Sequence, residues 1–287
     1  MKETFGQKTR RSHKRNQRVV MFWCAFVFAF VIAGVWLFRG TLFQNDSGAS
    51  SSGTNQSRHD ACGTADSRQK STDVTQAPMD HEVWQKLQDL VSQDQRVQQV
   101  IDNCEIYPED ILKMLSRNLD MLNFVLEYPE KVGQVFAETV GEVEGGEVPL
   151  LLQYDQRWGY GDYGNSSVAV SGCGPACLSM VITSLTGDDT ITPYVVAQYA
   201  SEQGYYVPGA GTAWTLMSEG AKHFGVIGEE LPLTKSIMEG VLREGRPIIC
   251  SMRPGDFTTT GHFIVITGIK DGQFTVNDPN STERSNM

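Results

Sequence analysis

Residues 171–181 have the sequence SGCGPACLSMV, in which a cysteine stands between two glycines and two residues before a proline. The glycines let the backbone turn sharply and leave the thiol of Cys173 uncovered, and Pro175 suits the first turn of a helix. We therefore predict a helix that begins near Cys173, runs through Leu185 and ends at Gly187. At a helix start the dipole and the free N–H groups stabilise a thiolate, so Cys173 is a candidate nucleophile.

Two structural roles for Cys173 stay open from this segment alone: an inert thiol, or a disulfide with Cys177 that would distort the helix start. A histidine further along the chain favours chemistry over both. His262 follows Gly261 and opens the apolar run HFIVITG, residues 262–268, which is typical of a buried strand. The other four histidines lie in the basic N-terminus, in or beside a polar linker, or at a helix end. His262 is therefore the candidate general base.

The strand after His262 predicts which carboxylate orients it. A three-residue hairpin loop at 270–272 would place Ile266 opposite Val276 and bring Asp278 onto the face of the histidine. A two-residue loop would move polar residues of the second strand onto that face, so the apolar pattern favours the longer loop. Asp278 can then fix the imidazole tautomer. A plain turn role for Asp278, and Asn277 as the orienting residue, are the alternatives.

Four further residues are expected to contact substrate. Gln153 ends an apolar run and is a candidate donor to the oxyanion, beside the backbone N–H of Cys173. Tyr205, Tyr206 and Trp214 flank a glycine-rich segment that we expect to form a cleft wall and bind substrate.

Charge and composition exclude several classes of protein. Residues 1–40 contain eight of the 24 Lys and Arg residues and one acid, so the rest of the chain has 16 basic against 33 acidic residues. Such an acidic body repels nucleic acid, and no DNA or RNA partner is expected. The six cysteines and five histidines show no metal-ligand spacing. We expect neither a metal nor an organic cofactor.

The N-terminal region predicts a membrane anchor. Residues 19–38 contain no charged side chain and follow a basic cluster. As a helix they would span roughly 30 Å, the thickness of the hydrocarbon core of a bilayer. The positive-inside rule then places the N-terminus in the cytoplasm and the rest of the chain outside the cell membrane, as a single-pass protein. A cleaved signal peptide is the alternative, although the run is long for one and lacks a cleavage site at its end.

Composition and residue pattern divide the chain into five segments. We predict a basic cytoplasmic tail (1–18), the transmembrane helix (19–38), a flexible linker (39–78), a helical stalk (79–144) and a catalytic domain (145–287). In the last domain helices are expected at 175–185, 212–223 and 236–243, and strands at 148–153, 247–252, 262–269 and 273–277. Helices thus precede an antiparallel sheet, which is an α+β order.

The residues at 153–158, 171–180, 209–214, 261–268 and 276–279 together resemble the C39-like peptidase family of Gram-positive bacteria. This family is similar to the peptidase domains that process bacteriocin leaders in ABC exporters and is papain-like in fold. The resemblance implies Cys173 as nucleophile, His262 as base, Asp278 as third member and Gln153 as oxyanion donor.

Two departures from that family matter. The exporter peptidases have their glutamine six residues before the cysteine, where this chain has Ser167. The chain also stops soon after Asp278, whereas relatives continue, so we expect a domain truncated at its C-terminus. The predicted function is a membrane-anchored extracellular cysteine peptidase acting on a peptide or protein. The alternatives are an amidase or endopeptidase that cuts cell-wall peptides with the same triad, and a non-catalytic surface module that binds peptides or wall polymers.

Overall fold

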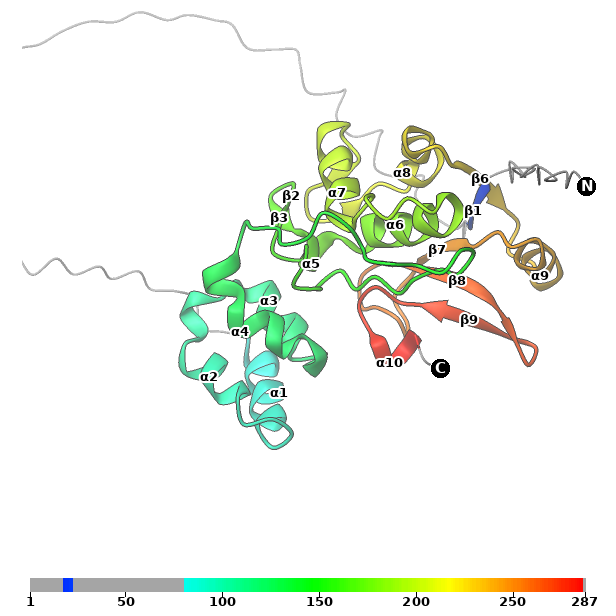
Figure 1. Ribbon diagram of the computed structural model, residues 1–287. Coiled ribbons are helices and arrows are strands. Elements are labelled where there is room, and N and C mark those ends of the chain that lie inside the picture. The colour runs from blue at the N-terminus through cyan, green and yellow to red at the C-terminus, as the bar shows by residue number, and fades with distance from the viewer. Residues whose placement is uncertain (1–17, 23–79, 286–287) are drawn as a thin grey trace, which may run out of the picture. The chain divides into compact units, whose positions relative to one another are not determined.

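A computed structural model of the protein describes residues 18–22 and 80–285. The first part of this region is helical, as the periodicity of its apolar residues predicts. It comprises helices α1 (His81–Val91), α2 (Val97–Asp102), α3 (Glu109–Leu115) and α4 (Leu122–Lys131), with 3-10 turns at Cys104–Ile106 and Leu119–Met121. Figure 1 shows these helices, in cyan and green, grouped together.

This helical segment shares a core with the domain that follows it. Its buried residues form one cluster with Tyr154, Tyr160 and Ala169. The ring of Phe124 in α4 stacks on that of Tyr160, with centroids 4.3 Å apart. Short helices with apolar stripes are marginal alone and need a surface to cover them. The segment therefore packs on the domain that follows it, and its role as a stalk stays a prediction.

The C-terminal domain begins with small elements around one long helix. These are β2 (Asp162–Tyr163), β3 (Ser166–Ser167), α5 (Val168–Ser171), α6 (Cys173–Thr186), α7 (Pro193–Glu202), β4 (Tyr206–Val207), β5 (Gly211–Thr212), α8 (Thr215–Ser218) and the 3-10 helix η3 (Gly220–Phe224). Helix α6 ends as predicted at Gly187, whose φ of 74° gives the left-handed cap that glycine adopts without strain. The helix expected at 212–223 is shorter, because Thr212 pairs with Tyr206 in a hairpin instead of capping it.

A sheet completes the domain, in the strand order β6-β1-β7-β8-β9. The strands are β6 (Ile227–Leu231), β1 (Arg18–Phe22), β7 (Ile248–Met252), β8 (His262–Lys270) and β9 (Gln273–Asn277), and helices α9 (Lys235–Arg243) and α10 (Thr282–Ser285) accompany them. Strands β7, β8 and β9 are antiparallel, as predicted. Alternate residues of β8 pack toward the α6 cluster (Phe263, Val265) and toward α9 (Ile264, Ile266). The sheet therefore lies between these two helices (Figure 1).

Strand β1 differs from the transmembrane helix predicted for 19–38. Its five residues pair in parallel with β6 on one side, and Val20, Met21 and Phe22 pair in parallel with β7 on the other. An extended segment between two strands satisfies backbone N–H and C=O groups that would otherwise be unpaired. Among the residues that the structure describes, no helix is both long and apolar enough to span a bilayer. Residues 23–38, the tail 1–17 and the linker 39–78 lie outside the described residues.

At the end away from its turn, the β8–β9 hairpin has the predicted register, but the turn itself differs from the predicted one. Ile266 does pair with Val276, whereas beyond this point the pairs shift by one residue at a bulge between Ile266 and Gly268. The loop is the two residues Asp271 and Gly272, both at positive φ as in a type I′ turn. The predicted three-residue loop is thus wrong, and the bulge restores the register that it was meant to explain.

The strand predicted at 148–153 is absent. This segment runs past the end of β9 as an irregular stretch and forms isolated hydrogen bonds there in place of strand pairing. The Asn277 side chain donates to the carbonyl oxygen of Val148 at 3.0 Å, and the N–H of Gln153 donates to that of Pro279 at 2.8 Å.

Candidate active site

Cys173 is the first residue of α6, as its flanking glycines and Pro175 predict. Its thiol is hydrogen-bonded to the imidazole of His262, on β8. Burial by itself raises the pKa of this thiol, but the bond to His262, the charge of that ring and the N–H groups of Phe263 and Gly174 outweigh it and lower the pKa below its usual value. A cysteine so placed is poised to be a thiolate. Cys173 and Cys177 are both free thiols, so the alternative of a disulfide between them is wrong.

His262 lies between the thiol and a carboxylate. Its Nε2 donates to Oδ1 of Asp278 at 2.7 Å, which leaves Nδ1 to face Cys173. Burial opposes the charged ring, yet the hydrogen bonds with Asp278 and Cys173 raise the pKa of His262 to about 9. The pKa values of thiol and imidazole therefore move toward each other and favour a thiolate–imidazolium pair.

Asp278 is completely buried and saturated with donors. Besides His262, its Oδ1 accepts from the N–H of Asn280 at 2.8 Å, and its Oδ2 accepts from Nε of Arg284 at 2.5 Å. Burial alone would raise the pKa of this carboxyl, but these donors keep it below its usual value. Asn277, the alternative orienting residue, is engaged with Val148 instead.

The wall beside the thiol is closely packed. A Cβ on Gly174 would lie 2.7 Å from the side chain of Thr212, so only glycine fits there without movement. The hydroxyl of Thr212 is hydrogen-bonded to that of Tyr163 at 2.8 Å. Tyr163 in turn contacts the ring of Tyr206 edge-on, with centroids 4.8 Å apart. The hairpin β4–β5 is thus held against the start of α6.

Gln153 lies close to the aspartate loop. It is 3% exposed, its backbone N–H donates to Pro279, and its side-chain nitrogen donates to the carbonyl oxygen of Ala169 at 2.5 Å. One amide N–H is therefore already used, and its oxygen has no hydrogen-bond partner among the described residues. The role of oxyanion donor stays a prediction.

The substrate role of Tyr205, Tyr206 and Trp214 stays a prediction, although Tyr205 and Tyr206 contact different rings. Tyr206 belongs to the wall described above, and Trp214 is partly exposed just before α8. Tyr205 points elsewhere, since adjacent residues of an extended segment face opposite ways. Its ring is 6.1 Å from that of Tyr199 in α7.

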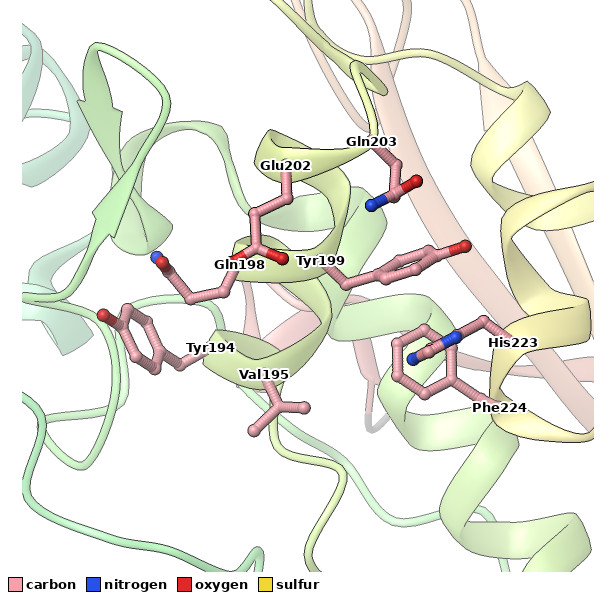
Figure 2. A pocket seen from close by; sticks show the side chains of 8 residues that line it. All are labelled: Tyr194, Val195, Gln198, Tyr199, Glu202, Gln203, His223 and Phe224. Carbon is pink, nitrogen blue, oxygen red and sulfur yellow. The ribbon is translucent and has the colours of Figure 1, made fainter.

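Tyr199 belongs to a groove of about 450 Å³ between α7 and η3, whose lining includes none of Cys173, His262 and Asp278. Figure 2 shows Tyr199, His223 and Phe224 together at one end of it and Tyr194 at the other. His223 stacks on Tyr199, with centroids 4.2 Å apart. The groove is therefore separate from the triad.

Two residues near the site were missed by the sequence reasoning. Arg284 follows Asp278 by six residues in a short polar segment, and Tyr163 lies in a two-residue strand. Neither residue belongs to a periodic pattern that would mark it as part of the site. The one usable signal was an arginine soon after Asp278, the predicted catalytic aspartate.

The comparisons with known proteins agree with this geometry. Residues 146–287 match the model of the peptidase C39 like family, and the match contains all three members of the Cys–His–Asp set. No curated protein and no solved structure matches the chain. The resemblance inferred from the sequence motifs is thereby confirmed. Residues 146–287 of the chain form a domain that belongs to the peptidase C39-like family.

Proposed function

We propose that the protein is a cysteine peptidase that hydrolyses peptide bonds with Cys173 as nucleophile, His262 as general acid and base, and Asp278 as the residue that orients the imidazole. One observation carries the proposal: Nε2 of His262 lies 2.7 Å from a buried carboxylate oxygen while the same ring is hydrogen-bonded to the thiol at the start of α6. This is the arrangement that nucleophilic catalysis by cysteine requires.

In the first half of the reaction, the thiolate of Cys173 attacks the carbonyl carbon, a C–S bond forms and the carbonyl oxygen becomes an oxyanion. N–H groups at the start of α6 face this charge, because the first N–H groups of a helix have no intrahelical acceptor. The imidazolium of His262 then gives its proton to the amide nitrogen, the C–N bond breaks and the amine leaves.

The second half regenerates the enzyme. His262, now neutral, accepts a proton from water as the water oxygen attacks the thioester carbon. The C–S bond breaks, the carboxylic acid leaves, and the thiolate–imidazolium pair returns. Asp278 keeps the ring in place through both halves.

The decisive experiment uses a peptide library and the whole chain, with and without Cys173→Ala, and reads cleavage by mass spectrometry. We expect cleavage by the unchanged protein and a loss of about a thousandfold or more in the variant. Cleavage that persists in Cys173→Ala would refute the proposal. A matched control is Cys250→Ala, which removes a different buried thiol.

The proposal includes a membrane anchor formed by residues 19–38, with the catalytic domain outside the cell. Its support is the uncharged run after a basic cluster. Residues 19–22 cannot be in a membrane helix and in strand β1 at once. Alkaline carbonate extraction of membranes distinguishes a membrane helix from strand β1. A chain with a spanning helix stays in the membrane pellet, whereas release of the chain into the supernatant refutes the anchor.

A further inference from the structure

The second oxygen of Asp278 is held by a residue that a cysteine–histidine–aspartate mechanism does not itself require. Oδ2 accepts from Nε of Arg284, in α10, at 2.5 Å. Asp278 has no solvent exposure, whereas the Arg284 side chain is 27% exposed. A buried carboxylate with a well-placed guanidinium is expected to stay ionised at every pH at which the protein is folded.

Two titratable side chains are hydrogen-bonded to Asp278, His262 from β8 and Arg284 from α10. Two more feel its charge: Tyr154, from the segment before β2, and Cys177, from α6. Burial raises the pKa of Tyr154 to about 12 and that of Cys177 well above its usual value, so both are neutral near pH 7. The two cations beside Asp278 are therefore the imidazolium and the guanidinium.

The loop that carries Arg284 is tied down at several points. The N–H of Asp278 donates to Oγ of Ser285 at 2.8 Å, and that hydroxyl donates to the carbonyl oxygen of Ser281 at 2.7 Å. From the helical segment, Asn118 donates to the carbonyl oxygen of Asn280 at 2.8 Å. The segment from Asp278 to Ser285 is thus fixed by hydrogen bonds within itself and to the helical segment, and this holds Arg284 beside Asp278.

We propose that Arg284 is a positioning residue of the catalytic site, which holds Asp278 through its second oxygen and sets the pH range in which Cys173 and His262 form their ion pair. This inference rests on the proposed function for its biological meaning. Its chemistry concerns only the protonation of Cys173 and His262, and it can be measured without a substrate.

The sign of the effect follows from charge. With the guanidinium removed, the group of thiolate, imidazolium and carboxylate loses a nearby positive charge, so each proton binds more readily. The pH at which Cys173 becomes a thiolate rises, and the pH at which the imidazolium loses its proton rises too. A pH–rate profile has an acidic limb, where Cys173 ionises, and a basic limb, where the imidazolium loses its proton. Both limbs then move to higher pH.

The test is the rate of Cys173 alkylation by iodoacetamide between pH 5 and 10, followed by mass spectrometry of the labelled peptide. For Arg284→Gln we expect both limbs to move up by about half to one pH unit, which is a three- to tenfold slower reaction below the acidic limb. Arg284→Lys keeps a cation and should leave the limbs near their original positions. Arg243→Gln, which removes a surface arginine paired with Glu239, is the matched control and should not move them.

Unmoved limbs in a folded Arg284→Gln protein would overturn the inference. If that variant does not fold, the double variant Asp278→Asn/Arg284→Gln decides. Recovery of folding there would show that the single variant failed because a buried carboxylate lost its counter-charge, which supports the inference. A double variant that is also unfolded, when Asp278→Asn alone is folded, would show that Arg284 serves the fold alone.

These outcomes are independent of the proposed peptidase function. Limbs that move in a protein without peptide hydrolysis would refute that function and leave the inference standing. Limbs that stay in place in a protein that hydrolyses peptides would overturn the inference and leave the peptidase function standing.

Discussion

The replacement Asp278→Asn tests the site most directly, because it removes the charge of the side chain with little change of shape. The amide would have to satisfy the donors that now point at Asp278: the ring of His262 and the N–H of Asn280 at Oδ1, and Arg284 at Oδ2. An asparagine presents one acceptor and one NH₂ group, so at least one of these donors would meet another donor. In this environment asparagine cannot simply take the place of aspartate.

The size of the effect can be estimated from the pKa of His262. That pKa is raised from 6.5 to about 9. The difference corresponds to roughly 3 kcal/mol in favour of the charged ring. Asp278 and Cys173 both contribute to it against the cost of burial. Without the carboxylate we expect the pKa of His262 to fall by about 1–2 units, and the population of the thiolate–imidazolium pair to fall by about 10- to 100-fold.

The assay is alkylation of Cys173 at pH 6–7, where the ion pair makes the thiol reactive and an ordinary cysteine is mostly protonated. Asp271→Asn is the matched control, since it makes the same chemical change in the exposed hairpin turn, where asparagine tolerates the positive φ of 53°. The reasoning is refuted if Asp278→Asn reacts as fast as the unchanged protein and with the same pH dependence.

Three other predictions concern pH and packing. The rate of peptide hydrolysis should rise with pH as Cys173 ionises, below the usual range of a thiol, and fall as the pH passes about 9, where His262 loses its proton. The raised pKa of His262 also stabilises the fold. This contribution to stability should be complete below about pH 6.5 and lost on the way to about pH 9, as thermal unfolding across this range would show. Asn118→Ala should slow Cys173 alkylation by about three- to tenfold because the loop after Asp278 loses its anchor on the helical segment, and an unchanged rate would contradict that coupling. Gly174→Ala should lower the unfolding free energy by about 1–3 kcal/mol because its Cβ meets Thr212, whereas Gly240→Ala in α9 meets nothing within 4 Å and should raise it by about 0.5–1 kcal/mol, both measured by urea titration.

The parts of the site that could be predicted from sequence depend on neighbours close in the chain. The start of α6 at Cys173 and its end at Gly187 follow from glycine and proline chemistry. The β8–β9 hairpin brings His262 and Asp278 together because the two strands are joined by a tight turn. The register near the triad was right although the predicted turn was wrong, since the bulge that corrects it leaves no clear mark in the apolar pattern.

The remaining features depend on contacts between residues that are distant in the chain, which local sequence patterns do not reveal. Residues 148–153 are as apolar as a strand, but they form only isolated hydrogen bonds with the end of β9 and the loop after it. Residues 18–22 do pair as a strand, between β6 and β7. The apolar stripes of the helical segment do not by themselves reveal that it packs against Tyr160. Burial and electrostatic pairing arise only in the folded chain. The chemical groups of the site could therefore be read from the residue types, whereas folding brings Arg284 to Asp278.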